Sequence, residues 1–173
     1  LEALPRPMTA FDAIALGTGV GVSPEVGGLV EALRAGCRAP LILDADALTV
    51  YAGRLDALRG GGGPLILTPH PGEMARLLGR EVDWVQTHRQ EAVQAASEQV
   101  GGVVVLKGAG TLIKEPGRPT GMNLTGNPGM ARGAMGDILT GLLGGLAAQG
   151  IKPFESACAA VYLHGRAGDN AAW

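Results

Sequence analysis

The sequence contains few aromatic residues, few charged residues and two cysteines. Aromatic side chains make up 3% of the 173 residues and charged side chains 17%. Cys37 and Cys158 lie in unrelated local contexts, and no spacing of Cys and His matches a zinc site. These absences exclude a disulfide-rich or zinc-dependent scaffold. They favour a reducing compartment, so we expect a cytoplasmic protein.

The sequence also lacks long apolar runs and an excess of one charge. Every apolar stretch is interrupted well before the roughly 18 residues typical of a transmembrane helix. The net charge is −2 and the charges are interspersed, which excludes a basic surface for nucleic acid and a polybasic segment for a membrane. Residues 1–6 have no charged region followed by an apolar one, so they do not match a signal peptide. We therefore expect a soluble protein with small ligands.

Glycine, by contrast, is abundant. The chain has 29 glycines in 173 residues, more than twice the average usage of about 7%, without the Gly-X-Y period of collagen. Apolar residues make up 46% of the chain, which argues against disorder. The length is that of one domain, so we expect a single domain over residues 1–173 with glycines in its turns.

Short apolar runs alternate with amphipathic stretches along the chain. The runs predict strands at 11–16, 40–43, 65–67 and 103–106, and 111–114 predicts a hairpin partner. Helices are expected at 24–36, 73–78 and 84–100, from 137 onward, and from 153 to beyond 169. This alternation predicts an α/β fold with a mostly parallel sheet and helices on both of its faces.

Four segments rich in Gly or Pro follow these strands, at 17–21, 44–46, 68–73 and 107–111. Ligands of open α/β sheets bind at the carboxyl ends of the strands. The first segment is unlike a dinucleotide-binding fingerprint, because Val22 stands where its third glycine should be. A tight strand-to-helix turn fits better, and a loop lining another ligand is the third option.

The next two segments each allow two interpretations. Asp44 and Asp46 could hold Mg²⁺ through water, or they could cap the following turn. In the segment Thr68-Pro69-His70-Pro71-Gly72-Glu73, two prolines restrict the orientation of one histidine. That histidine is either a ligand-binding group or part of a structural turn in which Glu73 caps a short helix.

The fourth segment, 107–111, and the later stretch 126–137 both suggest binding of an anion. Lys107 is followed by a glycine-containing loop whose N–H groups can approach a phosphate, although a plain hairpin turn explains the same residues. In 126–137, small residues precede a helix whose first-turn N–H groups and dipole favour an anion. Asp137 is there either a general base or an acid that stabilises the helix dipole. We expect His164 to be a packed or hydrogen-bonded core residue.

Taken together, 44–48, 68–73, 107–111 and 126–141 resemble the ADP-dependent NAD(P)H-hydrate dehydratases, relatives of ribokinase. The resemblance runs from about residue 11 to the end of the chain. It implies a three-layer ribokinase-like fold, and a hydro-lyase that repairs hydrated NADH and NADPH, called NADHX and NADPHX. Such enzymes use ADP, or ATP in some branches, with Mg²⁺ to phosphorylate the added hydroxyl, and loss of phosphate then restores the ring.

The resemblance also implies roles for individual residues. It assigns Asp137 as the catalytic base that also contacts the hydrate, and it assigns Gly21 and His70 to the hydrate pocket. Asp44 and Asp46 match an element placed near metal or substrate. The remaining positions form an anion hole of Gly133, Ala134, Met135 and Gly136, and a nucleotide site of Lys107, Gly108, Ala109, Gly110, Thr111 and Gly136.

This chain departs from the family pattern in two ways. Arg132 and Ala134 stand where a small or hydroxyl residue and a glycine are expected, and the chain is expected to be incomplete at both termini. Two alternatives are therefore kept: a ribokinase-like vitamin kinase and an inactive nucleotide-binding fragment. The resemblance further implies that a homo-oligomer is possible, as is an epimerase that is fused to the protein or acts beside it.

Overall fold

The fold is described from a computed structural model, which describes residues 8–172. The expectation for residues 1–6 therefore lies outside the described residues. The strands are β1 (Ile14–Leu16), β2 (Leu41–Leu43), β3 (Leu65–Leu67), β4 (Val103–Leu106), β5 (Thr111–Lys114) and β6 (Gly121–Asn123). The α-helices are α1 (Pro24–Gly36), α2 (Ala45–Thr49), α3 (Pro71–Leu78), α4 (Val82–Thr87), α5 (Arg89–Val100), α6 (Met135–Ala148) and α7 (Pro153–Ala171). Three short 3-10 helices are η1 (Met8–Ala10), η2 (Leu55–Leu58) and η3 (Pro128–Met130).

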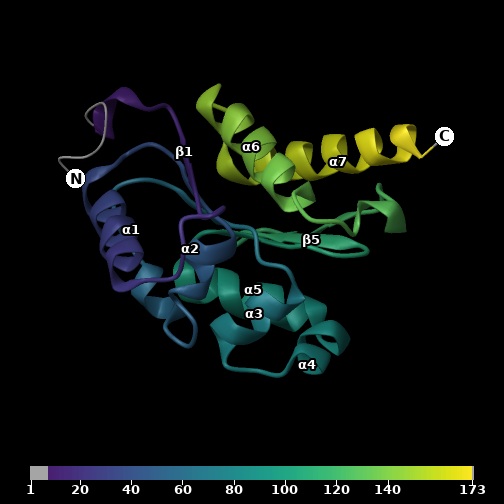
Figure 1. Cartoon of the computed structure of the whole chain (residues 1–173), viewed down its shortest axis with the longest axis horizontal. Helices are drawn as coiled ribbons and strands as arrows, with labels where there is room; N and C mark the ends of the chain where they lie inside the picture. Colours follow the sequence, from purple (N-terminus) through teal and green to yellow (C-terminus); the bar gives the residue numbers. More distant parts are fainter. Residues whose placement is uncertain (1–7, 173) are drawn as a thin grey trace.

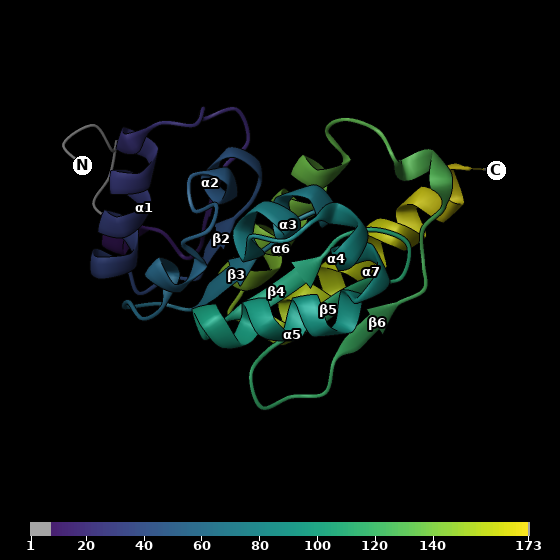
Figure 2. The same ribbon diagram turned by 90° about the horizontal axis from the view of Figure 1, so that it is seen from below.

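The six strands form one sheet in the order of the sequence, β1 to β6. The first four strands are parallel to one another, whereas β5 and β6 are antiparallel to their neighbours. Helices lie on both faces: α6 and α7 on one side, and α3, α4 and α5 on the other (Figures 1 and 2). The predicted α/β fold with a mostly parallel sheet is confirmed.

Alternate residues of the strands pack into two separate hydrophobic cores, one on each face of the sheet. Leu41, Leu43, Leu65 and Leu67 join the larger core, which includes buried residues of α1 to α5. Ile42 and Ile66, between them, join the smaller core with α6 and α7. A strand buried on both faces must be apolar at every position, which is why these strands read as continuous apolar runs.

Several elements differ from the expectations. The helix expected over 84–100 is broken at His88, whose backbone leaves the helical region (φ −122°, ψ 43°). Beside the break, the hydroxyl of Thr87 donates to the carbonyls of Asp83 and Trp84, an arrangement that competes with regular helix geometry. The helices α3 and α6 each begin two residues earlier than expected. The elements α2, η2 and β6 were not predicted, and each is five residues or shorter.

The remaining expectations concern single residues and the membrane. Cys37 and Cys158 are both free. His164 is half-buried, and its Nε2 atom is shielded from solvent with no hydrogen-bond partner in residues 8–172. Within the same residues, no helix combines the length and the apolar character that crossing a bilayer requires.

Candidate active site

The four segments that follow β1 to β4 meet at the carboxyl edge of the parallel strands. Backbone hydrogen bonds join them in pairs: Asp46 N–H donates to Gly17 O at 3.2 Å, and Lys107 N–H donates to Pro69 O at 2.9 Å. The side chains of Lys107 and Asp44 bridge the second and fourth segments. The structure therefore joins residues that lie up to 63 positions apart in the sequence.

Asp44 is the buried centre of this edge, with 1% of its surface exposed. Its Oδ1 atom lies 2.7 Å from Nζ of Lys107, and its Oδ2 atom accepts a hydrogen bond from the Thr140 hydroxyl at 2.8 Å. A buried carboxylate is tolerated only when it is paired and hydrogen-bonded in this way. Asp44 thus ties the ends of β2 and β4 to helix α6.

Asp46, the other metal candidate, faces the glycine loop after β1. Its Oδ2 atom accepts a hydrogen bond from the backbone N–H of Gly21 at 2.9 Å. Across residues 8–172, no three His, Cys, Asp or Glu side chains are grouped so that they could hold a metal ion. Both oxygens of Asp44 and one oxygen of Asp46 already take part in hydrogen bonds or ion pairs with other segments of the site.

Lys107 places a positive charge beside the first turn of α6. Its Nζ atom is 3.8 Å from Oε2 of Glu73, and a Cβ added at Gly136 would lie 3.3 Å from the same nitrogen. A side chain at 136 would press on the ammonium, so glycine permits this approach. Ala134 at the N-cap offers no side-chain cap, which leaves first-turn N–H groups for a ligand. A cation and a helix N-terminus together favour an anion here.

Asp137 lies in that first turn and is exposed to solvent. Its Oδ1 atom accepts a hydrogen bond at 3.1 Å from the hydroxyl of Thr18, in the loop after β1. A carboxylate at the edge of an anion site can receive the proton of a hydroxyl that attacks the bound group. Sequence reasoning missed Thr18 and Thr140. Thr18 stood within the glycine loop already singled out, whereas nothing in the sequence pointed to Thr140.

His70 combines the two interpretations that the sequence left open. Its Nδ1 atom accepts hydrogen bonds from the N–H groups of Gly72 and Glu73, and Glu73 Oε2 accepts from the N–H of His70 at 2.7 Å. This is a capping box at the start of α3. The imidazole is nonetheless 50% exposed and faces the site edge with Nε2 3.4 Å from Glu73 Oε1. Burial lowers the pKa of His70, against the opposing effect of Glu73.

The loop that leads into the anion site rests on α7. The N–H of Gly126 donates to Asp169 Oδ2 at 3.0 Å, and the amide of Asn127 donates to Gly168 O at 2.8 Å. Close packing explains two glycines of α7, because a Cβ at Gly165 would clash with the Thr125 hydroxyl and one at Gly168 with the Met130 side chain. Helix α7 thus holds residues 125–130, and a hollow of about 420 Å³ lies beside them.

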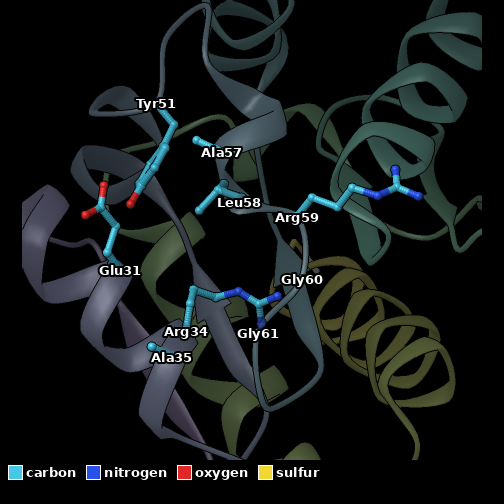
Figure 3. Close-up of a pocket in the computed structure, with 9 residues that line it drawn as sticks. All are labelled: Glu31, Arg34, Ala35, Tyr51, Ala57, Leu58, Arg59, Gly60 and Gly61. Atoms are coloured by element: carbon cyan, nitrogen blue, oxygen red, sulfur yellow. The ribbon is translucent and has the colours of Figure 1, made fainter.

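A cavity of about 210 Å³ opens elsewhere, between the end of α1 and the segment before β3 (Figure 3). Three of the polar side chains that line it donate hydrogen bonds to backbone carbonyls. Arg34 donates to Gly63 O at 2.7 Å, Tyr51 to Gly27 O at 3.3 Å and Arg59 to Glu98 O at 2.7 Å. It lies at the amino ends of the strands, so it is separate from the site described above.

The chain is similar to several known proteins. A family model described as NAD(P)H-hydrate dehydratase matches residues 5–173. The chain is 43% identical over 162 residues to an ADP-dependent (S)-NAD(P)H-hydrate dehydratase of Neisseria meningitidis, covering 92% of this chain and 55% of the relative. It is 44% identical over 172 residues to a bifunctional NAD(P)H-hydrate repair enzyme of Moorella thermoacetica, covering 99% of this chain and 32% of that protein.

A solved structure is similar as well. The ADP/ATP-dependent NAD(P)H-hydrate dehydratase of Bacillus subtilis, co-crystallised with ATP and Mg²⁺, superimposes with a TM-score of 0.83 at 37% identity. The match covers 94% of this chain and 56% of that one. A hydroxyethylthiazole kinase from Pyrococcus horikoshii, at 22% identity and a TM-score of 0.63, shares the ribokinase-like fold alone. The chain therefore spans between about a third and somewhat over half of these relatives.

Proposed function

Because the chain belongs to the NAD(P)H-hydrate dehydratase family, we propose that it is an ADP- or ATP-dependent hydro-lyase that repairs NADHX and NADPHX. One observation carries the proposal: the carboxylate of Asp137 lies at the N-terminus of α6, where Lys107 and free N–H groups favour a phosphoryl group. A base and an anion site so arranged suit phosphoryl transfer to a hydroxyl.

The reaction has two steps. Asp137 takes the proton of the ring hydroxyl, whose oxygen attacks the terminal phosphorus of the nucleotide. A new O–P bond forms while the P–O bond to the rest of the nucleotide breaks. AMP is released when ADP is the donor, and ADP is released when ATP is the donor. The C–O bond then breaks, phosphate leaves with its electron pair, and a ring proton is lost to restore the double bond. Lys107 and the first-turn N–H groups of α6 stabilise the phosphoryl charge during transfer.

The proposed binding residues line this same edge. We assign the nucleotide to Lys107–Thr111 and Gly136, the transferred phosphoryl to Gly133–Gly136, and the hydrate to Gly21, His70 and Asp137. Mg²⁺ usually binds through substrate phosphates and one or two carboxylates, and it supplies neutralisation of phosphate charge. Of the two candidates, Asp46 fits better, because both oxygens of Asp44 are already hydrogen-bonded. A cytoplasmic location, a homo-oligomer and an epimerase partner stay predictions.

The test is recovery of dihydronicotinamide absorbance when the protein is incubated with NADHX or NADPHX, Mg²⁺ and ADP or ATP. Recovery that requires nucleotide supports repair and identifies the donor. A stable phosphate ester as product would instead favour the vitamin-kinase alternative. Because the chain spans only part of its relatives, the assay is repeated on a longer form of the protein; activity there alone would identify this chain as an inactive fragment.

The Asp137→Asn variant is the first mutational prediction. The amide cannot accept the hydroxyl proton, so we expect turnover to fall by about 10²- to 10⁴-fold, the usual contribution of a general base. Nucleotide affinity should change little, and a calorimetric titration with ADP measures it. Turnover within about twofold of the parent would exclude Asp137 as the base.

A further inference from the structure

Arg89, at the first position of α5, contacts backbone carbonyls of the proposed nucleotide loop. Its Nη2 atom donates to three backbone carbonyls, those of Leu106 at 3.1 Å, Lys107 at 3.3 Å and Gly110 at 3.5 Å. Its Nη1 atom donates to Gln86 Oε1 at 3.2 Å. The guanidinium therefore joins the end of β4 to both sides of the loop over 107–110.

The direction of these hydrogen bonds matters for an anion. In a planar trans peptide, the C=O and N–H groups point in opposite directions. The carbonyl of Lys107 points toward Arg89, so the N–H of Gly108 in the same peptide points away from it. Likewise the Leu106 carbonyl faces Arg89 while the N–H of Lys107 faces the carbonyl of Pro69. Both peptides therefore turn their carbonyls toward Arg89 and their N–H groups away from it.

The loop needs such a restraint because its glycines are conformationally free. Gly108 and Gly110 have φ values of +130° and +64°, which other residues rarely adopt. The guanidinium lies directly against the first of them, since a Cβ at Gly108 would be 3.2 Å from Nη1. Within residues 8–172, no carboxylate pairs with Arg89. Its positive charge is therefore balanced only by neutral acceptors among these residues, which also favours a phosphate near the loop.

From this geometry we infer that Arg89 is a positioning residue for the nucleotide: it holds the loop over 107–110 so that the Gly108 N–H faces the phosphates. The inference rests on the proposed function. Arg89 contacts backbone carbonyls of the loop, whereas Lys107 and Asp137 are the residues proposed to act on the reacting groups.

Arg59 supplies a matched control. It also donates from one guanidinium nitrogen to backbone carbonyls, those of Glu98 at 2.7 Å and Gln99 at 3.3 Å. These carbonyls lie at the opposite end of the same helix, α5, away from the loop. Arg59→Met therefore removes two hydrogen bonds from an arginine to carbonyls of α5 without touching the proposed site.

The experiment compares Arg89→Met, Arg89→Lys and Arg59→Met with the parent protein. Hydrogen exchange of the peptide covering 107–111, measured without ligand, reports the order of the loop. Dissociation constants for ADP and ATP report how the loop contributes to nucleotide binding. KM values for nucleotide and hydrate show whether the effect is confined to the nucleotide. We expect about tenfold faster exchange and about tenfold weaker nucleotide binding for Arg89→Met, the scale of losing one hydrogen bond to a charged group. Hydrate KM should stay within twofold.

Arg89→Lys should give an intermediate effect, because it keeps the charge but loses the planar fork. It also covers the case in which Arg89→Met fails to fold. Exchange and nucleotide affinity equal to those of Arg59→Met would overturn the inference, as would an equal rise in the KM values of nucleotide and hydrate. A parent protein that binds no nucleotide would overturn the proposed function and the nucleotide role of Arg89, while exchange would still decide whether Arg89 orders the loop.

Discussion

Ala134 has a backbone conformation that alanine adopts at a cost. Its φ is +68° at the N-cap of α6, in the left-handed region, where a β-carbon costs about 1–2 kcal/mol. The family pattern that the sequence resembles predicts a glycine at this position. The structure supplies the reason, since the turn into the anion site requires a positive φ.

We predict that Ala134→Gly stabilises the protein by about 0.5–1 kcal/mol. Relief of the strain is partly offset by the greater freedom of glycine in the unfolded chain, which costs about 0.4–1 kcal/mol. Urea denaturation measures the difference, and nucleotide affinity should be unchanged or tighter. Ala45 is a useful comparison, because it also has a positive φ (47°) but is the first residue of α2. Destabilisation by Ala134→Gly would show that the methyl group contributes packing.

At the scale of elements, the turn after β1 determines how the loops of β1 and β2 meet. Gly17 has φ +145°, and a Cβ there would lie 1.8 Å from the carbonyl oxygen of Asp44. The carbonyl of Gly17 also accepts a hydrogen bond from the N–H of Asp46. Glycine is required at 17 because backbone meets backbone, and no side-chain rotation can relieve the clash.

We therefore expect Gly17→Ala to destabilise the protein by several kcal/mol, about 3 or more, and to displace Asp44 from Lys107. Thermal unfolding and nucleotide titration measure the two effects. Gly28→Ala is the control, since it lies in α1 with no atom within 4 Å of an added Cβ. That substitution should be neutral or stabilise by up to about 1 kcal/mol. Equal behaviour of the two variants would contradict the close approach of β1 and β2.

Elements also explain which expectations failed. The sequence of 84–100 has helical character throughout, yet Thr87 and His88 break it into α4 and α5 through local hydrogen bonds. That break places Arg89 at the start of α5, under the loop over 107–110. The strand β6 was missed because its three residues, Gly121–Asn123, lack an apolar pattern and are recognised only by their pairing with β5.

For the whole molecule, two histidines couple stability to pH. Burial lowers the pKa of His70, where Lys107 and Arg76 act in the same direction while Glu73 and Asp44 oppose them. Burial also lowers the pKa of His164. A histidine with a lowered pKa is more readily protonated when unfolded, so its contribution to stability is present above its ordinary value of about 6.5 and is lost below it.

We predict that the free energy of unfolding falls as the pH drops from about 6.5 toward 5. In His70→Asn the slope should be shallower, because asparagine retains an N-cap acceptor but does not titrate. His164→Gln should reduce it further. Urea denaturation at several pH values measures the slopes. If the variant that carries both His70→Asn and His164→Gln keeps the parent's change of unfolding free energy with pH, other groups cause the pH dependence.

The sequence by itself determined the architecture and the motifs. Short apolar runs bounded by turn residues are typical of strands in a covered sheet, and amphipathic stretches between them are typical of its helices. The motif residues at 44–46, 68–73, 107–111 and 126–137 were recognisable because each carries unusual local chemistry: paired carboxylates, prolines around a histidine, or a cation before glycines.

Only the tertiary structure decided which groups share the work at the site. That Asp44 would be buried between Lys107 and Thr140, and that Thr18 would contact Asp137, depends on chain segments more than 60 residues apart. The support that Arg89 gives to the loop over 107–110 depends likewise on where α5 packs. Such contacts follow from packing against the sheet, and single polar residues on helices leave no periodic trace in a sequence.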